Sequence, residues 1–376
     1  MSGIYLHIPF CAKKCSYCDF HFSTTFEAYR NEMIDCLVEE INLRAPLWSA
    51  RKMDTIYFGG GTPSLLKPHE LKRIFDTIAG HFDVSEVSEI TLEANPDDCS
   101  EENIAAWKEL GVNRLSIGIQ STTPTQLAWM NRTHNAEEGL QAVKRAIVLG
   151  IDQISVDLIY GLPDLSVADW EAQLREITAL PIQHISAYCL TVEERTPLAA
   201  WVKKGVIHPV DADMQSLHFE RMVAVLKTAG FEQYEISNFA REEAYAKHNS
   251  SYWLGRKYLA IGPSAHGFDG KDRYWNVANN QQYMRALKNK QLDQEVEVLT
   301  NFDRFNERIM VGLRTKWGVK MHELLELCSP APEWYQQVES YKTSGKLVEE
   351  NGTLLLTESG RLLADAIASE LFLLAD

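Results

Sequence analysis

The chain has 376 residues, of which 45% are hydrophobic and 24% charged, and its formal net charge is −15. This composition is ordinary for a globular protein, and the length predicts a large domain followed by a smaller one. The negative charge excludes a non-specific nucleic-acid binder, because phosphates would be repelled. No apolar run of about 18 residues and no signal-peptide pattern occur, so we expect a cytoplasmic protein without a transmembrane segment.

Six short β-branched runs alternate with helical patterns through the first half of the chain. The predicted strands are 4–8, 55–58, 89–93, 114–118, 153–157 and 184–188, and the predicted helices are 27–45, 68–80, 101–110, 136–149 and 167–178. This alternation predicts a parallel sheet with right-handed crossovers. Polar or glycine-rich segments follow successive strands, as at the carboxyl rim of a β/α barrel. We therefore expect an α/β fold, a partial (β/α)6 TIM-type barrel, rather than a doubly wound sheet.

The last third of the chain predicts a small, mainly helical unit. Helices are expected over 301–314, 320–327, 333–344 and 358–371, with a hairpin over 346–356 that turns at Asn351-Gly352. Three helices with a two-stranded wing resemble a winged-helix module, and here we expect it to cap the barrel rather than to bind DNA. The predicted divisions are 1–235 for the barrel, 236–295 for an aromatic-rich connecting segment and 296–376 for the winged-helix-like domain.

Three cysteines near the amino terminus carry the most specific signal. Cys11, Cys15 and Cys18 have C-x3-C-x2-C spacing, which suits three corners of a [4Fe–4S] cluster whose fourth iron stays open. Lys13 and Lys14 lie between them, and we expect their charge to lower the thiol pKa values. A zinc knuckle or scattered buried cysteines are the alternatives. The zinc alternative is disfavoured because no fourth Cys or His follows at a usual zinc spacing.

The segments after the next strands predict a seat for a small cofactor. A Gly59–Pro63 turn (GGGTP) brings the backbone close to a ligand and offers N–H groups to the amino-acid end of that cofactor. Glu93 and Asp157 are expected to accept hydrogen bonds from ribose hydroxyls or an ammonium group, and Gln120 and Arg132 to donate. Lone carboxylates at strand ends are also common as helix caps or surface charges. Their convergence on one rim favours the binding interpretation.

A second unusual cluster is His248-Asn249-Ser250-Ser251-Tyr252-Trp253. A histidine beside aromatic side chains suits axial ligation of haem iron, with the rings packed on the macrocycle. The same pattern also fits a hydrogen-bonded packing histidine in an aromatic core. His7, His21 and His266 are competing haem ligands.

From Tyr5 to its end the chain resembles the oxygen-independent coproporphyrinogen III oxidase (HemN-like) family of radical S-adenosylmethionine (SAM) proteins. The resemblance rests on YLHIPFCAKKCSYCDF, YFGGGTPS, LEANPD, RLSIGIQS and the Asp157 strand, in that order. It implies a partial β/α barrel with a carboxyl-terminal helical domain. It also implies Cys11, Cys15 and Cys18 as cluster ligands and His248 as the haem ligand. The implied SAM contacts are Tyr5, Tyr17, Gly60, Gly61, Thr62, Glu93, Gln120, Arg132 and Asp157.

Two branches of this family must be separated. The oxidases have a CxxxCxxCxC motif and a long amino-terminal extension, whereas Phe20 occupies the fourth cysteine position here. The HNSSYW segment instead resembles the HNxxYW motif of the haem-chaperone branch. The resemblance therefore implies a haem chaperone that delivers haem to haem-dependent proteins, respiratory ones among them. Oxidative decarboxylation of porphyrinogen propionates is the alternative function. Homodimer formation and peripheral membrane contact stay open.

Overall fold

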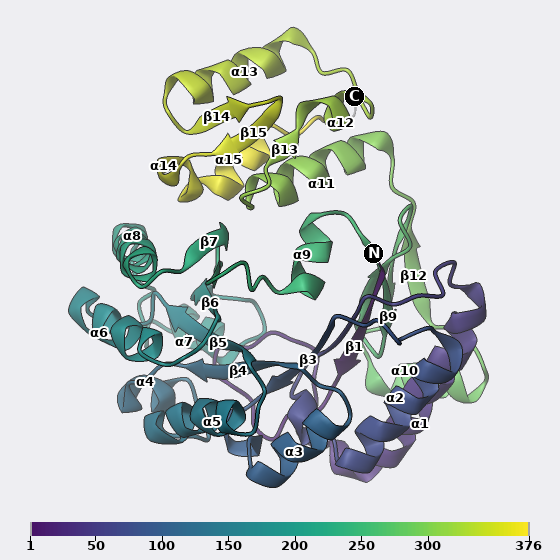
Figure 1. Ribbon diagram of the computed structural model, residues 1–376. Coiled ribbons are helices and arrows are strands. Elements are labelled where there is room, and N and C mark those ends of the chain that lie inside the picture. The colour runs from purple at the N-terminus through teal and green to yellow at the C-terminus, as the bar shows by residue number, and fades with distance from the viewer. Residues whose placement is uncertain (1, 375–376) are drawn as a thin grey trace.

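The computed structural model describes residues 2–374, and its centre is a curved sheet whose first six strands are all parallel (Figure 1). These strands are β1 (Ser2–Ile8), β2 (Thr55–Gly60), β3 (Glu89–Ala94), β4 (Arg114–Gln120), β5 (Gln153–Tyr160) and β6 (His184–Cys189). They lie side by side in sequence order without a reversal. A doubly wound sheet reverses its strand order at a switch point, so the predicted partial barrel is confirmed.

Helices cover the outer side of these strands (Figure 1). They are α1 (Arg30–Arg44), α2 (Pro68–His81), α3 (Glu101–Glu109), α4 (Pro124–Trp129), α5 (Ala136–Val148) and α6 (Val167–Thr178). Helix α5 begins with a reciprocal capping box between Asn135 and Glu138, and its small residues Ala142, Val143 and Ala146 face the sheet. Since the strands are buried on both faces, they have the continuous apolar runs typical of parallel sheets.

The middle of the chain extends this sheet at both edges. Strands β7 (Glu232–Glu235) and β8 (Asn238–Ala240) follow β6, while β9 (Lys257–Ile261), β10 (His266–Phe268), β11 (Arg273–Asn276) and β12 (Gln294–Glu297) continue beyond β1. The helices of this part are α7 (Pro197–Lys203), α8 (Ala212–Thr228), α9 (Lys247–Trp253) and α10 (Asn280–Lys288). For residues 236–295 we predicted only an aromatic-rich connecting segment, because strands this short carry no readable periodicity. We made no prediction for α7, α8 and β7, which lie within the range 1–235 assigned to the barrel.

The carboxyl-terminal unit has its own hydrophobic cluster, with Phe305, Leu324 and Leu354 at its centre. Its elements are α11 (Asn301–Leu313), β13 (Val319–Lys320), α12 (Met321–Leu325), α13 (Pro332–Thr343), β14 (Leu347–Glu350), β15 (Thr353–Leu356), α14 (Glu358–Arg361) and α15 (Ala364–Glu370). Asn351 and Gly352 form the predicted hairpin turn, both with positive φ. The single helix predicted over 358–371 is wrong, because the helical conformation is interrupted between α14 and α15.

A buried carboxylate ties the added strands to the barrel. Glu40 of α1 is fully buried and accepts hydrogen bonds from Arg44 Nε at 2.6 Å and Asn276 Nδ2 at 2.7 Å. It also accepts from the Tyr283 hydroxyl at 2.6 Å and from the Gly262 N–H at 2.7 Å. The donors come from α1, β11, α10 and the turn after β9. One carboxylate therefore joins four segments, and its loss would leave the buried Arg44 charge without its ion-pair partner.

Replacing Glu40 with alanine should lower the free energy of unfolding by about 3–5 kcal/mol, because Arg44 would remain buried without its partner. Urea denaturation followed by circular dichroism measures this change. Glu39→Ala on the same helix is the matched control and should shift stability by less than about 0.5 kcal/mol. The combined Glu40→Leu, Arg44→Met variant should recover part of the loss. Equal stability of Glu40→Ala and Glu39→Ala would contradict a structural role for this charge.

Candidate cofactor site at the carboxyl ends of the strands

The loop that carries the three cysteines is anchored to the segment that follows β4. Ser16 N–H donates to the Met130 carbonyl at 3.2 Å, and Asn131 Nδ2 donates to the Lys14 carbonyl at 2.7 Å. Asn131 adopts a positive φ of 62°, a conformation that Asn tolerates better than most residues. These contacts hold residues 11–18 over the barrel mouth although no regular secondary structure supports them.

Two of the cysteine sulfurs also contact the barrel. Thr62 Oγ1 lies 3.4 Å from Cys11 Sγ, and Arg132 Nη1 lies 3.5 Å from Cys15 Sγ. Burial works against the charged form of Arg132, but the neighbouring Tyr17 and Cys15 outweigh it and raise the Arg132 pKa. Arg132 is therefore a permanent positive charge beside the loop, able to offset thiolate charge.

The three cysteines line one cavity of about 370 Å³, and all of them are free thiols. Within residues 2–374, no three Cys, His, Asp or Glu side chains are close enough to hold a single metal ion. A cluster separates its ligands over several irons, so three thiols from one loop fit a [4Fe–4S] group better than a zinc ion.

Burial raises the pKa of the Cys18 thiol to about 12. We expected the two lysines to lower the thiol pKa values, and for Cys18 this prediction is wrong. Lys13 and Lys14 are exposed, and desolvation dominates at Cys18. The thiol is protonated at neutral pH, so metal binding must release this proton.

The glycine-rich turn after β2 packs against the cysteine loop. Gly61 N–H donates to the Ile8 carbonyl at 2.9 Å, and Thr62 N–H donates to the Phe10 carbonyl at 2.6 Å. A Cβ atom at Gly61 would lie 2.4 Å from that Phe10 oxygen, so only glycine fits. Gly60 N–H donates to a carboxylate on β3. The expectation that these N–H groups point at a ligand is therefore wrong, because the protein itself uses them.

Two acidic side chains inside the barrel face the same cavity. Glu93 accepts a hydrogen bond from the Tyr57 hydroxyl at 2.7 Å, and Asp157 accepts from Ser116 Oγ at 2.9 Å. Burial raises the pKa of Glu93 to about 7, and the charge of Asp157 adds to that rise. Burial also raises the pKa of Asp157 to about 6, against the hydrogen bonds of Ser116 and Ser186. A cationic ligand would stabilise the ionised forms of both.

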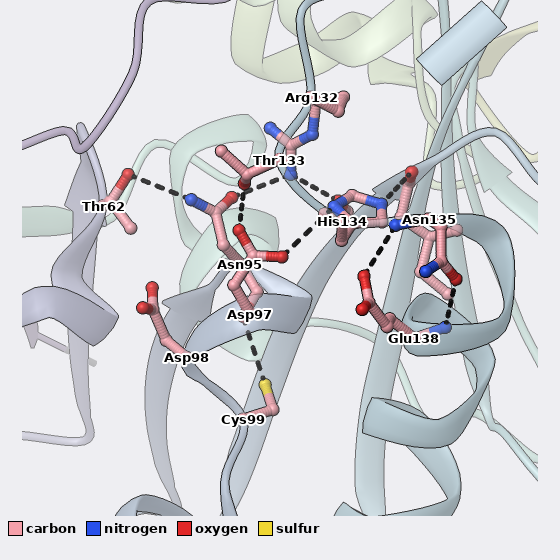
Figure 2. A network of polar contacts seen from close by, with 12 residues as sticks. Thr62, Asn95, Asp97, Asp98, Cys99, Arg132, Thr133, His134, Asn135 and Glu138 are labelled. Carbon is pink, nitrogen blue, oxygen red and sulfur yellow. Dashed lines mark hydrogen bonds and ion pairs between the residues drawn. The ribbon is translucent and has the colours of Figure 1, made fainter. Parts of the chain in front are cut away.

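Arg132 connects the ends of β3 and β4 (Figure 2). Its Nη2 donates to Asn95 Oδ1 at 2.8 Å and to the Gly118 carbonyl at 2.7 Å. Its Nε is shielded from solvent and has no hydrogen-bond partner among residues 2–374. A buried donor without a partner costs free energy, so this atom fits a ligand acceptor. Gln120, at a bulge in β4, has a positive φ of 67° that few non-glycine residues adopt.

The residues next to Arg132 are held by a second layer of polar contacts (Figure 2). Thr133 donates to Asp97, whose carboxylate lies 3.9 Å from His134 Nδ1. His134 is buried, and its Nε2 shares a hydrogen bond with the Ile119 carbonyl at 3.1 Å. This layer fixes the path of the chain between β4 and α5, and with it the orientation of Arg132.

Most predicted cofactor contacts lie together around this cavity. Those that line it are Tyr17, Gly60, Gly61, Thr62, Glu93, Gln120, Arg132 and Asp157. Tyr5 does not line it and lies instead along a neighbouring cavity, beside His7. The lining residues that we did not predict include Asn95, Ser116, Ser186, Tyr188, Cys189 and Asn249. Ser116 lies four residues before Gln120 on one strand, and this period-two spacing was the signal that could have found it.

His248 is inside the barrel and not at its mouth. The side chain is fully buried, and Nδ1 shares a hydrogen bond of 2.8 Å with Thr55 Oγ1. Nε2 shares one of 2.7 Å with the Tyr252 hydroxyl. Both ring nitrogens thus have a hydrogen-bond partner, and burial lowers the pKa of His248 to about 3. This geometry does not support His248 as a haem ligand, because binding iron would require breaking one of these bonds inside the core.

Helix α9, which carries the HNSSYW motif, instead packs against the residues that form one wall of the cavity. The His248 ring stacks on Tyr57 at a centroid distance of 5.1 Å and an interplanar angle of 27°. Glu89 at the start of β3 accepts the Lys247 and His248 N–H groups, each at 2.8 Å. Tyr57 in turn donates to Glu93. A continuous set of contacts therefore runs from α9 to the acidic wall of the cavity.

The raised pKa of Glu93 predicts a pH-dependent stability. Between its ordinary value of 4.5 and about 7, the folded chain keeps a proton that the unfolded chain has lost. Its contribution to the free energy of unfolding therefore falls as pH rises through this window. Glu93→Gln removes this contribution, so the variant should gain stability relative to wild type from about pH 5 to about pH 8. Urea denaturation across this range measures the difference, and a constant difference would contradict the raised pKa.

Comparisons with known proteins agree with this site. Residues 5–177 match the radical SAM superfamily, whose cofactors are a [4Fe–4S] cluster and SAM, and residues 299–363 match the HemN C-terminal domain. Heme chaperone HemW of Mycobacterium tuberculosis is 33% identical over 98% of this chain and 94% of that protein. HemW of Bacillus subtilis is 30% identical over 98% of both chains. The mitochondrial radical S-adenosyl methionine domain-containing protein 1 of Bos taurus is 40% identical over 96% of this chain and 83% of its own length.

The solved structure of coproporphyrinogen III oxidase (HemN) from Escherichia coli superimposes with a TM-score of 0.84, covering 98% of this chain and 89% of that chain. At 22% identity this likeness shows the fold alone. The full-length sequence relatives show more, and by them the chain belongs to the HemW family of radical SAM proteins.

Proposed function

We propose that this protein is a haem chaperone, which binds haem and delivers it to haem-dependent proteins. The observation that carries the proposal is the similarity, over almost the whole of both chains, to proteins named heme chaperone HemW. Phe20 gives independent support. It stands where the oxidases that the chain resembles have a fourth cysteine, and 67% of it is exposed beside the cysteine loop.

Cys11, Cys15 and Cys18 are the proposed ligands of the [4Fe–4S] cluster. Their support is their shared cavity and the contacts of Thr62 and Arg132 with two of the sulfurs. With SAM on the open iron, the cluster would supply one-electron chemistry at this site. The protein's own contribution is to orient the loop and to hold the Arg132 charge against the cluster.

The SAM contacts are proposed from the residues that share this cavity. Glu93, in its ionised form, would accept hydrogen bonds from the SAM ammonium group, and Asp157 from the ribose hydroxyls. The unpartnered Nε of Arg132 would donate to the SAM carboxylate. Tyr5 is proposed as a support for this pocket rather than as a direct contact, since it lies along the neighbouring cavity.

We further propose the three divisions 1–235, 236–295 and 296–376 as functional units. Their support is the separate hydrophobic cluster of the last unit and the family matches over 5–177 and 299–363. No helix within residues 2–374 is long and apolar enough to cross a membrane. The proposed place of action is the cytoplasm, with haem-dependent proteins, respiratory ones among them, as acceptors.

Cys15→Ser should abolish stable cluster binding, because a cluster held at three corners would lose one ligand and its contact with Arg132. Iron and sulfide analysis after anaerobic reconstitution measures the loss, together with the broad absorption of the thiolate–iron bonds. Cys328→Ser, in the carboxyl-terminal unit, is the matched control and should keep full iron content. Unchanged iron and sulfide in Cys15→Ser would remove this residue from the ligand set.

The function itself is tested by two assays on one anaerobic preparation. Haem titration should show saturable binding, followed by transfer of haem to an apo-haem protein. Incubation with coproporphyrinogen III, SAM and a reductant should form no vinyl product. Catalytic formation of protoporphyrinogen would overturn the proposal in favour of a radical SAM oxidase, and absence of haem binding would overturn it outright.

A further inference from the structure

A second cavity, of about 480 Å³, lies beside the proposed SAM site, and we call it the histidine cavity. Three imidazoles line it, those of His7 on β1, His21 after the cysteine loop and His266 on β10. It shares Phe20 and Glu93 with the cysteine-lined cavity, so the two sites are neighbours. Nothing in the proposed cluster and SAM chemistry uses these imidazoles.

The three histidines differ in how many of their ring nitrogens are free to bind iron. His7 is 6% exposed, and its two ring nitrogens contact the Tyr5 hydroxyl at 3.2 Å and the His21 carbonyl at 2.7 Å. His21 Nε2 is bonded to Asn280 Oδ1 at 2.7 Å. Neither ring nitrogen of His266 has a hydrogen-bond partner within residues 2–374, and its side chain is exposed. A neutral imidazole binds iron through the single nitrogen that carries its lone pair. Among the described residues His21 keeps one ring nitrogen without a partner, whereas His266 keeps both and is the most exposed of the three rings.

The His266 ring is also held in place from one side. It stacks on Trp275, its cross-strand neighbour on β11, at a centroid distance of 5.7 Å and an interplanar angle of 25°. Burial, with the charge of Arg273, lowers the His266 pKa, which keeps the imidazole neutral at physiological pH. A stacked, neutral imidazole loses little freedom when it binds a metal, because its ring plane is already set.

The walls of the histidine cavity suit a flat aromatic ligand with acidic groups. Phe20, Tyr252 and Tyr258 present ring surfaces, and the two tyrosines pack edge to face at 4.5 Å. Arg273 lies outside the lining and is paired with Glu307 at 2.7 Å, but it is a third exposed and its charge acts on both Tyr258 and His266. Aromatic rings would cover the macrocycle, and the positive charge beside the cavity would attract its carboxylates.

We propose that haem binds in the histidine cavity with its iron on His266. This inference rests on the proposed haem-chaperone function and names the site that performs it. Bound there, haem would lie against Phe20 and thus against the loop that carries the cluster ligands. The position at which the oxidases have a cysteine would then form part of the haem seat.

The test is a haem titration of the full-length His266→Ala variant, followed by Soret absorption and electron paramagnetic resonance. Affinity should fall by more than about tenfold, since even indirect partners of a metal ligand contribute about 10–100-fold. The histidine-ligated signature of ferric haem should disappear and return when free imidazole is added. His208→Ala, an exposed histidine that lines neither cavity, is the matched control and should bind as wild type does.

Iron–sulfide content and circular dichroism should be unchanged in His266→Ala, which separates ligand loss from misfolding. Wild-type affinity and spectrum in His266→Ala would overturn the inference while leaving the chaperone function intact. Loss of the signature in His21→Ala, but not in His266→Ala, would likewise overturn it. If the wild-type protein binds no haem, both the function and this site fail together.

Discussion

The Arg132 guanidinium connects the parts of the molecule on which the candidate site depends. It contacts the Cys15 sulfur, the Asn95 side chain and the Gly118 carbonyl, which belong to three separate segments. Hydrogen bonds to charged groups are worth about 1.5–3 kcal/mol each, so this residue can hold an irregular loop against a rigid sheet. The Asn131 and Thr62 side chains also hold this loop, but neither carries a charge. Arg132 therefore contributes to the position of the cysteines and adds a positive charge beside Cys15.

The interior of the barrel adds a second constraint from the opposite side. Helix α9 fills the space beneath the cavity, and His248 packs under Tyr57, whose hydroxyl donates to Glu93. Gly3 permits this insertion, since a Cβ there would lie 2.9 Å from the His248 ring. The HNSSYW motif thus shapes the floor of the cofactor site. Its histidine is conformationally locked, and in this conformation its role is structural.

The two cavities share walls, and this has a consequence for coupling. Phe20 and Glu93 border both, so a ligand in one cavity contacts residues that a ligand in the other also contacts. Coupling between two sites requires that one ligand alter the free energy of binding of the other, and shared side chains are the shortest physical route. Although the chain is acidic overall, positive charge from Arg132 and Arg273 lies next to the two cavities. The negative net charge of the chain therefore does not exclude positive charge beside the two cavities.

Local sequence determined much of the architecture. Strand–helix alternation predicted the six parallel strands to within a few residues. It could do so because an apolar run and the turn that ends it are local features of the sequence. The cysteine loop and the polar residues at strand ends were predicted to lie together on one rim of the barrel, because the carboxyl ends of parallel strands meet there. Periodicity did not reveal β7 to β12, because each of these strands has only three to five residues.

Tertiary structure alone decided which polar groups are free to bind a ligand. The N–H groups of Gly61 and Thr62, and both ring nitrogens of His248, look available in the sequence but have partners inside the fold. Of the four competing histidines, His266 is the one with both ring nitrogens free of partners within residues 2–374. Hydrogen-bond saturation depends on contacts between residues far apart in the chain, so spacing and residue type cannot predict it. The sequence determined which reactive side chains the chain contains. Long-range packing decided which of these side chains are free to bind a ligand.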